Sequence, residues 1–144
     1  MANVIPDSFK TDLLKGTFNF DSSGGSTFKL ALYTDISGLT TSTTAFTTSN
    51  EVSTSGTSYS SGGNTLTNNG VAIASNIAFV DFADLTFSSV TLSAVGALIY
   101  KSGGSNEAVL VLDFGGTKTA TNGDFVVQFP TASSSAAIIR LGNA

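Results

Sequence analysis

Short segments with alternating apolar residues, separated by turns rich in Gly, Asn and Ser, fill the chain from residue 26 onward. In STFKLALY (26–33), Phe28 and Leu30 alternate with smaller or polar neighbours, which is the period-2 pattern of a β-strand. Further strands are predicted over 64–68, 71–75, 77–83, 85–92, 95–102, 108–114, 124–129 and 136–142. About eight or nine strands in one small chain predict an all-β fold, a single antiparallel β-sandwich or jelly roll.

One short helix is predicted near the start of the chain. Pro6 and Asp7 form an N-terminal helix signal, and Gly16 stands where a C-terminal glycine is common. Phe9 and Leu13 have helical spacing between these two signals. Two interpretations stay open: the helix covers one end of a sheet, which we favour, or it is an arm that docks on a neighbouring molecule.

The stretch TTSNEVSTSGTSYSSGGNTL (47–66) has the composition of a flexible linker. A linker joins two domains, but residues 1–25 are too few to form one, and 144 residues predict a single domain over 1–144. The stretch is therefore predicted to belong to a long loop within that domain, from 34 to 63. Loops of this length are usually functional or disordered, and we expect an ordered loop that forms a contact surface.

Charged residues make up 11% of the chain, against roughly 25% in an average soluble domain. The polar surface must therefore consist largely of hydroxyl and amide groups. With a net charge of −4 and one Arg, the chain has no basic stripe for phosphates, so nucleic-acid binding is not expected. No apolar stretch approaches the ~20 residues of a membrane helix, and the N-terminus lacks the pattern of a secretory signal, so no membrane partner is expected.

Residues for catalysis are sparse. The chain has no His and no Cys, which excludes the common catalytic triads and zinc sites, and it has no G-x-S-x-G motif. Asp81 and Asp84 are three apart, so on a strand their carboxylates would point to opposite faces. Glu51 and Glu107 have no visible partner. We therefore expect a protein that is not an enzyme, with no catalytic residues and no cofactor.

A calcium site is the one metal site that the sequence suggests. Asp113, Asn122 and Asp124 lie in or beside predicted loops, and their oxygens suit hard cations. No EF-hand pattern is present, and Asp and Asn are far more often simple turn formers. We favour the turn interpretation and predict no metal site.

Segments in the same order along nearly the whole chain carry a resemblance to a known group of proteins. They are MANVIPDSFKTDLLKGTFNF, KLALYT, TTSNEV, GGNTL, VGALIYKS, VLDFGGTKTATNGDFVVQFP and AAIIRLG. Together they resemble small virion structural proteins of tailed bacteriophages, many of them from aquatic hosts, including cyanophages. The turn STSGTSY (53–59) is slightly longer than the compact Gly-x-Gly-Tyr of that family.

The resemblance implies a virion component without catalysis, assembled in the cytoplasm of a bacterial host. A capsid decoration (cement) protein is favoured, bound to the major capsid protein or another virion protein and present as a homo-oligomer, with a trimer favoured. A tail, fibre or adhesin subunit is the alternative, and a secreted enzyme or lectin is disfavoured. The expected contact segments are 1–20 and 34–63, with these interface residues: Ile5, Phe9, Leu13, Val52 and Tyr59.

Overall fold

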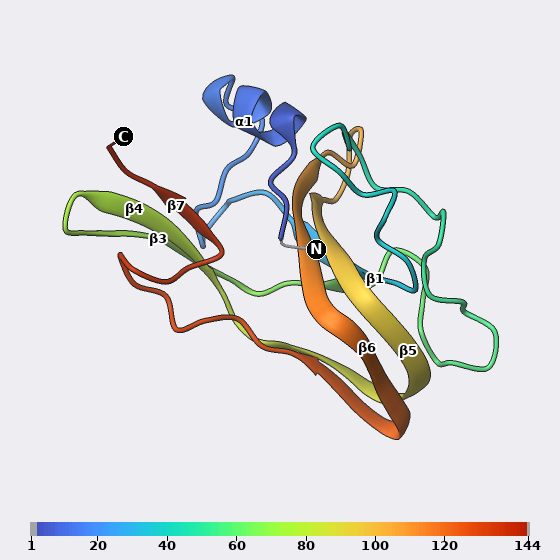
Figure 1. The fold of residues 1–144 in the computed structure, drawn as a ribbon. Helices are drawn as coiled ribbons and strands as arrows, with labels where there is room; N and C mark the ends of the chain where they lie inside the picture. The colour runs from blue at the N-terminus through green and yellow to red at the C-terminus, as the bar shows by residue number, and fades with distance from the viewer. Residues whose placement is uncertain (1–2, 144) are drawn as a thin grey trace.

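The computed structural model describes residues 3–143 and is mostly β-structure, with two antiparallel sheets and one short helix (Figure 1). The elements are α1 (Asp7–Leu14), β1 (Phe28–Tyr33), β2 (Asn64–Thr65), β3 (Asn68–Ala74), β4 (Ile77–Phe82), β5 (Leu85–Lys101), β6 (Ala108–Val127) and β7 (Ile139–Leu141). The strand order is β2-β1-β5-β6 in the larger sheet and β3-β4-β7 in the smaller one. The predicted helix and the all-β class are both confirmed.

The described strands number seven, fewer than predicted, because four predicted strands merge into two long ones. The segments 85–92 and 95–102 join in β5, and 108–114 and 124–129 join in β6. The β5–β6 ladder continues between the predicted strands because its register shifts near Phe87, Val90 and Ala94. Because such bulges also bend a strand, the β5–β6 pair turns sharply at its lower end in Figure 1.

The larger hydrophobic cluster lies between the two sheets and under α1, and phenylalanines dominate it. Phe20 and Phe28 stack with ring centroids 4.6 Å apart, and Phe28 meets Phe82 of β4 at 5.6 Å. Phe9 of α1 joins this group through Phe18, at 4.9 Å. The helix, both sheets and the connecting segment thus share one aromatic core.

A second, smaller cluster lies on the opposite face of the four-stranded sheet. Ala31 and Tyr33 of β1 pack there against Ile36 and Leu39, which belong to the predicted loop. Strand β1 is therefore buried on both faces. The long loop is the cover of this second face.

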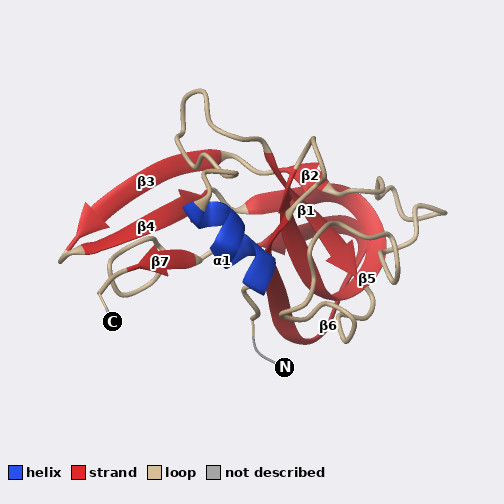
Figure 2. Ribbon diagram, turned by 90° about the horizontal axis from the view of Figure 1, so that it is seen from above, coloured by secondary structure: helices blue, strands red, loops and turns tan. Residues whose placement is uncertain are grey.

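The N-terminal segment is part of the folded unit. Val4 and Val111 exchange two backbone hydrogen bonds, of 2.9 and 2.8 Å, across the outer edge of β6. Phe9 is only 2% exposed, and seen from above α1 crosses between the two sheets (Figure 2). The helix thus covers the end of the core, as the favoured interpretation of the sequence has it.

Candidate interaction surface

All three tyrosines of the chain fix the loop 34–63 to the four-stranded sheet. Tyr33 of β1 donates its hydroxyl to the Thr47 carbonyl at 2.6 Å, and Tyr100 of β5 donates to the Gly62 carbonyl at 2.7 Å. Tyr59 lies in the loop, and its hydroxyl accepts the Leu32 backbone N–H at 3.0 Å. These side-chain bonds add to scattered backbone hydrogen bonds of the loop, such as that from the Val52 N–H to the Leu32 carbonyl at 2.9 Å.

The carboxylate of Glu51 is the centre of a second set of bonds within the loop. It accepts hydrogen bonds from the Tyr59 hydroxyl at 2.8 Å, the Ser61 hydroxyl at 2.8 Å and the Gly62 backbone N–H at 2.6 Å. Charge-assisted bonds of this kind are roughly twice as strong as neutral ones. Glu51 thus ties the middle of the loop to its end, just before β2.

The environment of these tyrosines keeps them protonated. Burial raises the pKa of Tyr33 well above its ordinary value, and the negative charge of Glu51 adds to the shift. Burial is also the main cause that raises the pKa of Tyr59, and it raises the pKa of Tyr100 in the same way. Each hydroxyl is consequently a hydrogen-bond donor at any physiological pH, as the contacts require.

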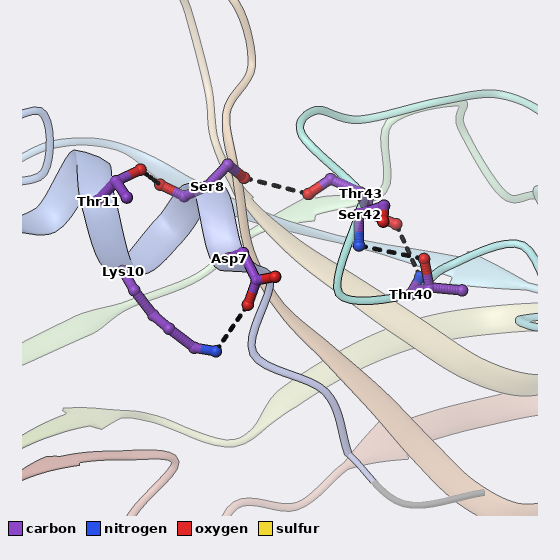
Figure 3. A network of polar contacts seen from close by, with 7 residues as sticks. All are labelled: Asp7, Ser8, Lys10, Thr11, Thr40, Ser42 and Thr43. Carbon is purple, nitrogen blue, oxygen red and sulfur yellow. Dashed lines mark hydrogen bonds and ion pairs between the residues drawn. The ribbon is translucent and has the colours of Figure 1, made fainter.

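Polar contacts join helix α1 to the loop 34–63 (Figure 3). The Asp7 backbone N–H donates to the Thr41 carbonyl at 2.9 Å, and the Ser8 hydroxyl donates to the Thr43 carbonyl at 3.1 Å. The helix–loop surface consists of these exposed residues: Asp7, Lys10, Thr11, Thr40, Thr41 and Ser42. Its only two charges pair with each other, because the Lys10 ammonium lies 2.8 Å from the Asp7 carboxylate.

The predicted interface residues lie mostly inside the molecule. Phe9, Val52 and Tyr59 are buried, and Leu13 packs partly buried against the aromatic core. Ile5 is 37% exposed. The two predicted contact segments do come together, and the side chains that they expose there form the helix–loop surface, while Phe9, Val52 and Tyr59 pack inside.

The residues weighed for calcium have local structural roles. The Asp113 carboxylate accepts the Gly115 backbone N–H at 2.8 Å, which lowers the pKa of Asp113. The Asp124 carboxylate accepts the Ser89 N–H at 3.4 Å, and Asn122 adopts a left-handed conformation. Within residues 3–143, no group of three or more acidic residues is placed to hold a metal ion.

The sequence singles out Tyr59 as a contact residue of the loop but does not indicate the other parts of the network. Tyr33 and Tyr100 have the pattern of ordinary strand residues, and Glu51 has no partner nearby in the sequence. The one signal in the sequence is that Tyr and Glu are rare, with three tyrosines and two glutamates in a chain rich in Ser, Thr and Gly. Their convergence requires the strand order of the folded sheet.

None of the helices in the described part of the chain is long and apolar enough to span a membrane. Comparisons of the chain with protein-family models, with curated proteins and with solved structures found no match.

Proposed function

We propose that this chain is a non-catalytic structural protein of a tailed-phage virion, and that it acts as a capsid decoration protein. The observation that carries the proposal is the helix–loop surface, which is rich in hydroxyl groups and has no net charge. A surface of this kind suits a permanent contact with another protein, because hydroxyl groups can hydrogen-bond without the desolvation cost of charges. The resemblance of the chain to phage virion proteins, in segments that follow one another in the same order, also supports a virion structural protein.

The anchoring of the loop supports a binding role instead of a linker role. A loop ordered before binding loses less conformational entropy when it meets a partner than a flexible one does. The three tyrosines and Glu51 supply that order. On this proposal, the helix–loop surface contacts the major capsid protein or a sister subunit in a homo-oligomer, with a trimer favoured.

We also infer that the two sheets form a sandwich-type architecture. Buried residues from both sheets share the larger hydrophobic cluster, which is the arrangement of two packed layers. A jelly roll has eight strands, whereas the described residues form seven, in sheets of four and three.

A tail, fibre or adhesin subunit is the second candidate. Its support is the composition of the loop, because Ser, Thr, Asn and Tyr side chains adapt to varied polar partners. In this case the loop would face the host surface. The absence of Trp from the chain weakens a sugar-binding site of this kind.

Copy number separates the two candidates. Quantitative mass spectrometry of purified virions of the phage that encodes this chain would give its ratio to the major capsid protein. A ratio near one is expected for a decoration protein, and a ratio lower by one or two orders of magnitude would move the chain to the tail or a vertex. Absence from the virion would overturn the proposal.

The role of the helix–loop surface can be tested with charge variants. Thr41→Lys and Ser42→Lys change exposed side chains and leave the backbone contacts of α1 intact. Both should keep the melting temperature and weaken binding to shells that lack the protein. The matched control is Thr121→Lys, an exposed position on β6 outside this surface, and it should bind normally. Equal binding by all three variants would show that the surface is not the contact.

A further inference from the structure

The outer edge of β3 differs from the other free strand edges among the described residues. Strand β6 is crossed by Val4, carries Lys118 and Asp124, and includes the left-handed Gly115. Strands β2 and β7 have only two and three residues, and Arg140 lies on β7. These features keep a strand edge from pairing with another chain.

The lower part of β5, which β1 does not reach, is protected in a similar way. Ser89 adopts a left-handed conformation there, beside the register shift that follows Phe87. The Thr91 backbone N–H donates to the Thr57 carbonyl of the loop at 3.0 Å. This edge is thus broken and partly covered.

Only the first half of β3 has comparable protection. The Asn68 amide donates to the Phe20 carbonyl at 3.0 Å, Ser22 lies close against Gly70, and the register shifts between Asn68 and Gly70. Beyond this bulge, Val71–Ala74 pairs regularly with β4 on one side. No described residue pairs with its other side.

The free half of β3 is also apolar and exposed. Val71 is 57% and Ile73 is 75% exposed, and Ala72 and Ala74 on the other face are exposed as well. The hairpin extends away from the β5–β6 pair, with β3 outermost in the smaller sheet (Figures 1 and 2). Next to it lies a small apolar groove of about 140 Å³, with these residues in its lining: Leu13, Phe20, Val71, Ile139 and Leu141.

Charge favours an identical partner at this edge. The segment 68–80 contains no charged residue, although the chain as a whole carries −4. Two copies can therefore bring these segments together without local like-charge repulsion. A charged partner, in contrast, would find no opposite charge there to pair with.

We propose that the free half of β3 pairs antiparallel with the same strand of a second copy of this chain. A two-fold axis at Ala72 places Val71 of each copy opposite Ile73 of the other, and β-branched cross-strand pairs of this kind stabilise a sheet. The two three-stranded sheets then form one six-stranded sheet with a continuous apolar face. This contact goes beyond the proposed function, and it can link subunits of neighbouring trimers.

The contact is small. Four residues of strand span roughly 13 Å, and such an edge buries far less than the roughly 800 Å² per partner of a standard stable interface. The isolated pair is therefore weak and short-lived in solution. It gains occupancy where other contacts hold many copies close together.

A chain without cysteine allows a direct test by disulfide trapping. Facing residues of an antiparallel pair have Cα atoms about 4.5–5.5 Å apart, within the range that a disulfide bridges. Purified Ala72→Cys protein under mild oxidation should form covalent dimers at least about tenfold faster than Ser55→Cys, an exposed loop control. In an equimolar mixture of Val71→Cys and Ile73→Cys proteins, the mixed dimer should exceed the two homodimers combined, because random pairing makes it only equal to their sum.

Further variants distinguish this pairing from random collision and from contacts with a different strand. Adding Ile73→Lys to Ala72→Cys should abolish the fast cross-linking, whereas Ile73→Val should preserve it. Cross-linking of Ala72→Cys at the rate of Ser55→Cys would overturn the proposal. Preferential cross-linking of Ala72→Cys to Arg140→Cys would overturn it in favour of head-to-tail pairing of β3 with β7. Because the test uses the isolated chain, its result is independent of whether the protein is found in a virion.

Discussion

The loop 34–63 and the β3–β4 hairpin invert the usual relation between regular structure and burial. The loop contains almost no regular structure, yet Val52 and Tyr59 within it are buried. The hairpin is a regular antiparallel ladder, yet Val71 and Ile73 on it are mostly exposed. Regular backbone pairing and burial of side chains are thus separate properties: the loop buries side chains without a regular ladder, and the outer strand of the hairpin has a regular ladder with exposed side chains.

The hairpin and the loop differ because their backbone groups find hydrogen-bond partners in different ways. A two-residue turn at Ser75 and Asn76, both left-handed, lets β3 and β4 satisfy each other locally. The loop has no such ladder, and it is held by isolated backbone bonds, such as that of the Val52 N–H to the Leu32 carbonyl, and by the tyrosine hydroxyls of β1 and β5. It follows that stability should be sensitive to side chains in the loop and insensitive to side chains at the free end of the hairpin.

The largest effect is expected for Tyr59→Ala. Removal of a buried aromatic side chain should lower the free energy of unfolding by about 3–5 kcal/mol, measured by urea denaturation. Tyr59→Phe keeps the ring against Phe87 and loses only the hydroxyl, so it should cost about 1–3 kcal/mol. Equal and small losses for both variants would mean that the loop is not anchored by this residue.

Two glycines of the loop provide the next test. A Cβ at Gly63 would collide with the Leu30 carbonyl oxygen, whereas a Cβ at Gly56 meets nothing within 4 Å. Both have positive φ, so both alanine variants incur a conformational penalty of about 1 kcal/mol. Gly63→Ala should be less stable than Gly56→Ala by at least a further ~1 kcal/mol in thermal or urea unfolding. Similar stabilities would argue against close packing of the loop's end on β1.

Alkaline pH should loosen the loop through its tyrosines. The pKa values of Tyr33 and Tyr59 are raised in the folded state, so the folded chain holds these protons more tightly than the unfolded chain. Their contribution to stability is complete below the unfolded pKa of about 10 and declines as the pH rises above it.

The urea midpoint should therefore fall above about pH 10, with tyrosinate absorbance appearing together with unfolding. Tyr59→Phe should weaken this dependence. Tyrosinate absorbance that rises in the folded protein near pH 10 would contradict the burial of these hydroxyls.

The smallest effect is expected at the free end of the hairpin. Ile73→Ala should change the free energy of unfolding by no more than about 0.5 kcal/mol, because the side chain is largely in water already. Ile99→Ala, the same change at a fully buried position of β5, should cost about 2–5 kcal/mol. A large loss for Ile73→Ala in dilute protein would show that the hairpin packs on the core.

By itself, the sequence determined the local elements. The alternation in 26–33 and its successors predicted a mostly β chain, and Phe9 and Leu13 between Pro6 and Gly16 predicted the helix. These patterns depend only on residues close together in the chain, which is why they are visible without a structure. The bulges that join predicted strands into β5 and β6 were missed, because a bulge depends on the facing strand.

Tertiary structure alone decided which apolar residues are inside. Leu30 and Ile73 stand in similar alternating segments, but the first is fully buried and the second lies at an open edge. Likewise, Glu51 becomes the centre of a network only because Tyr59 and Gly62 fold back onto it. Periodicity fixes which residues share a face, whereas burial depends on whether a distant segment covers that face, and this is settled only when the whole chain packs together.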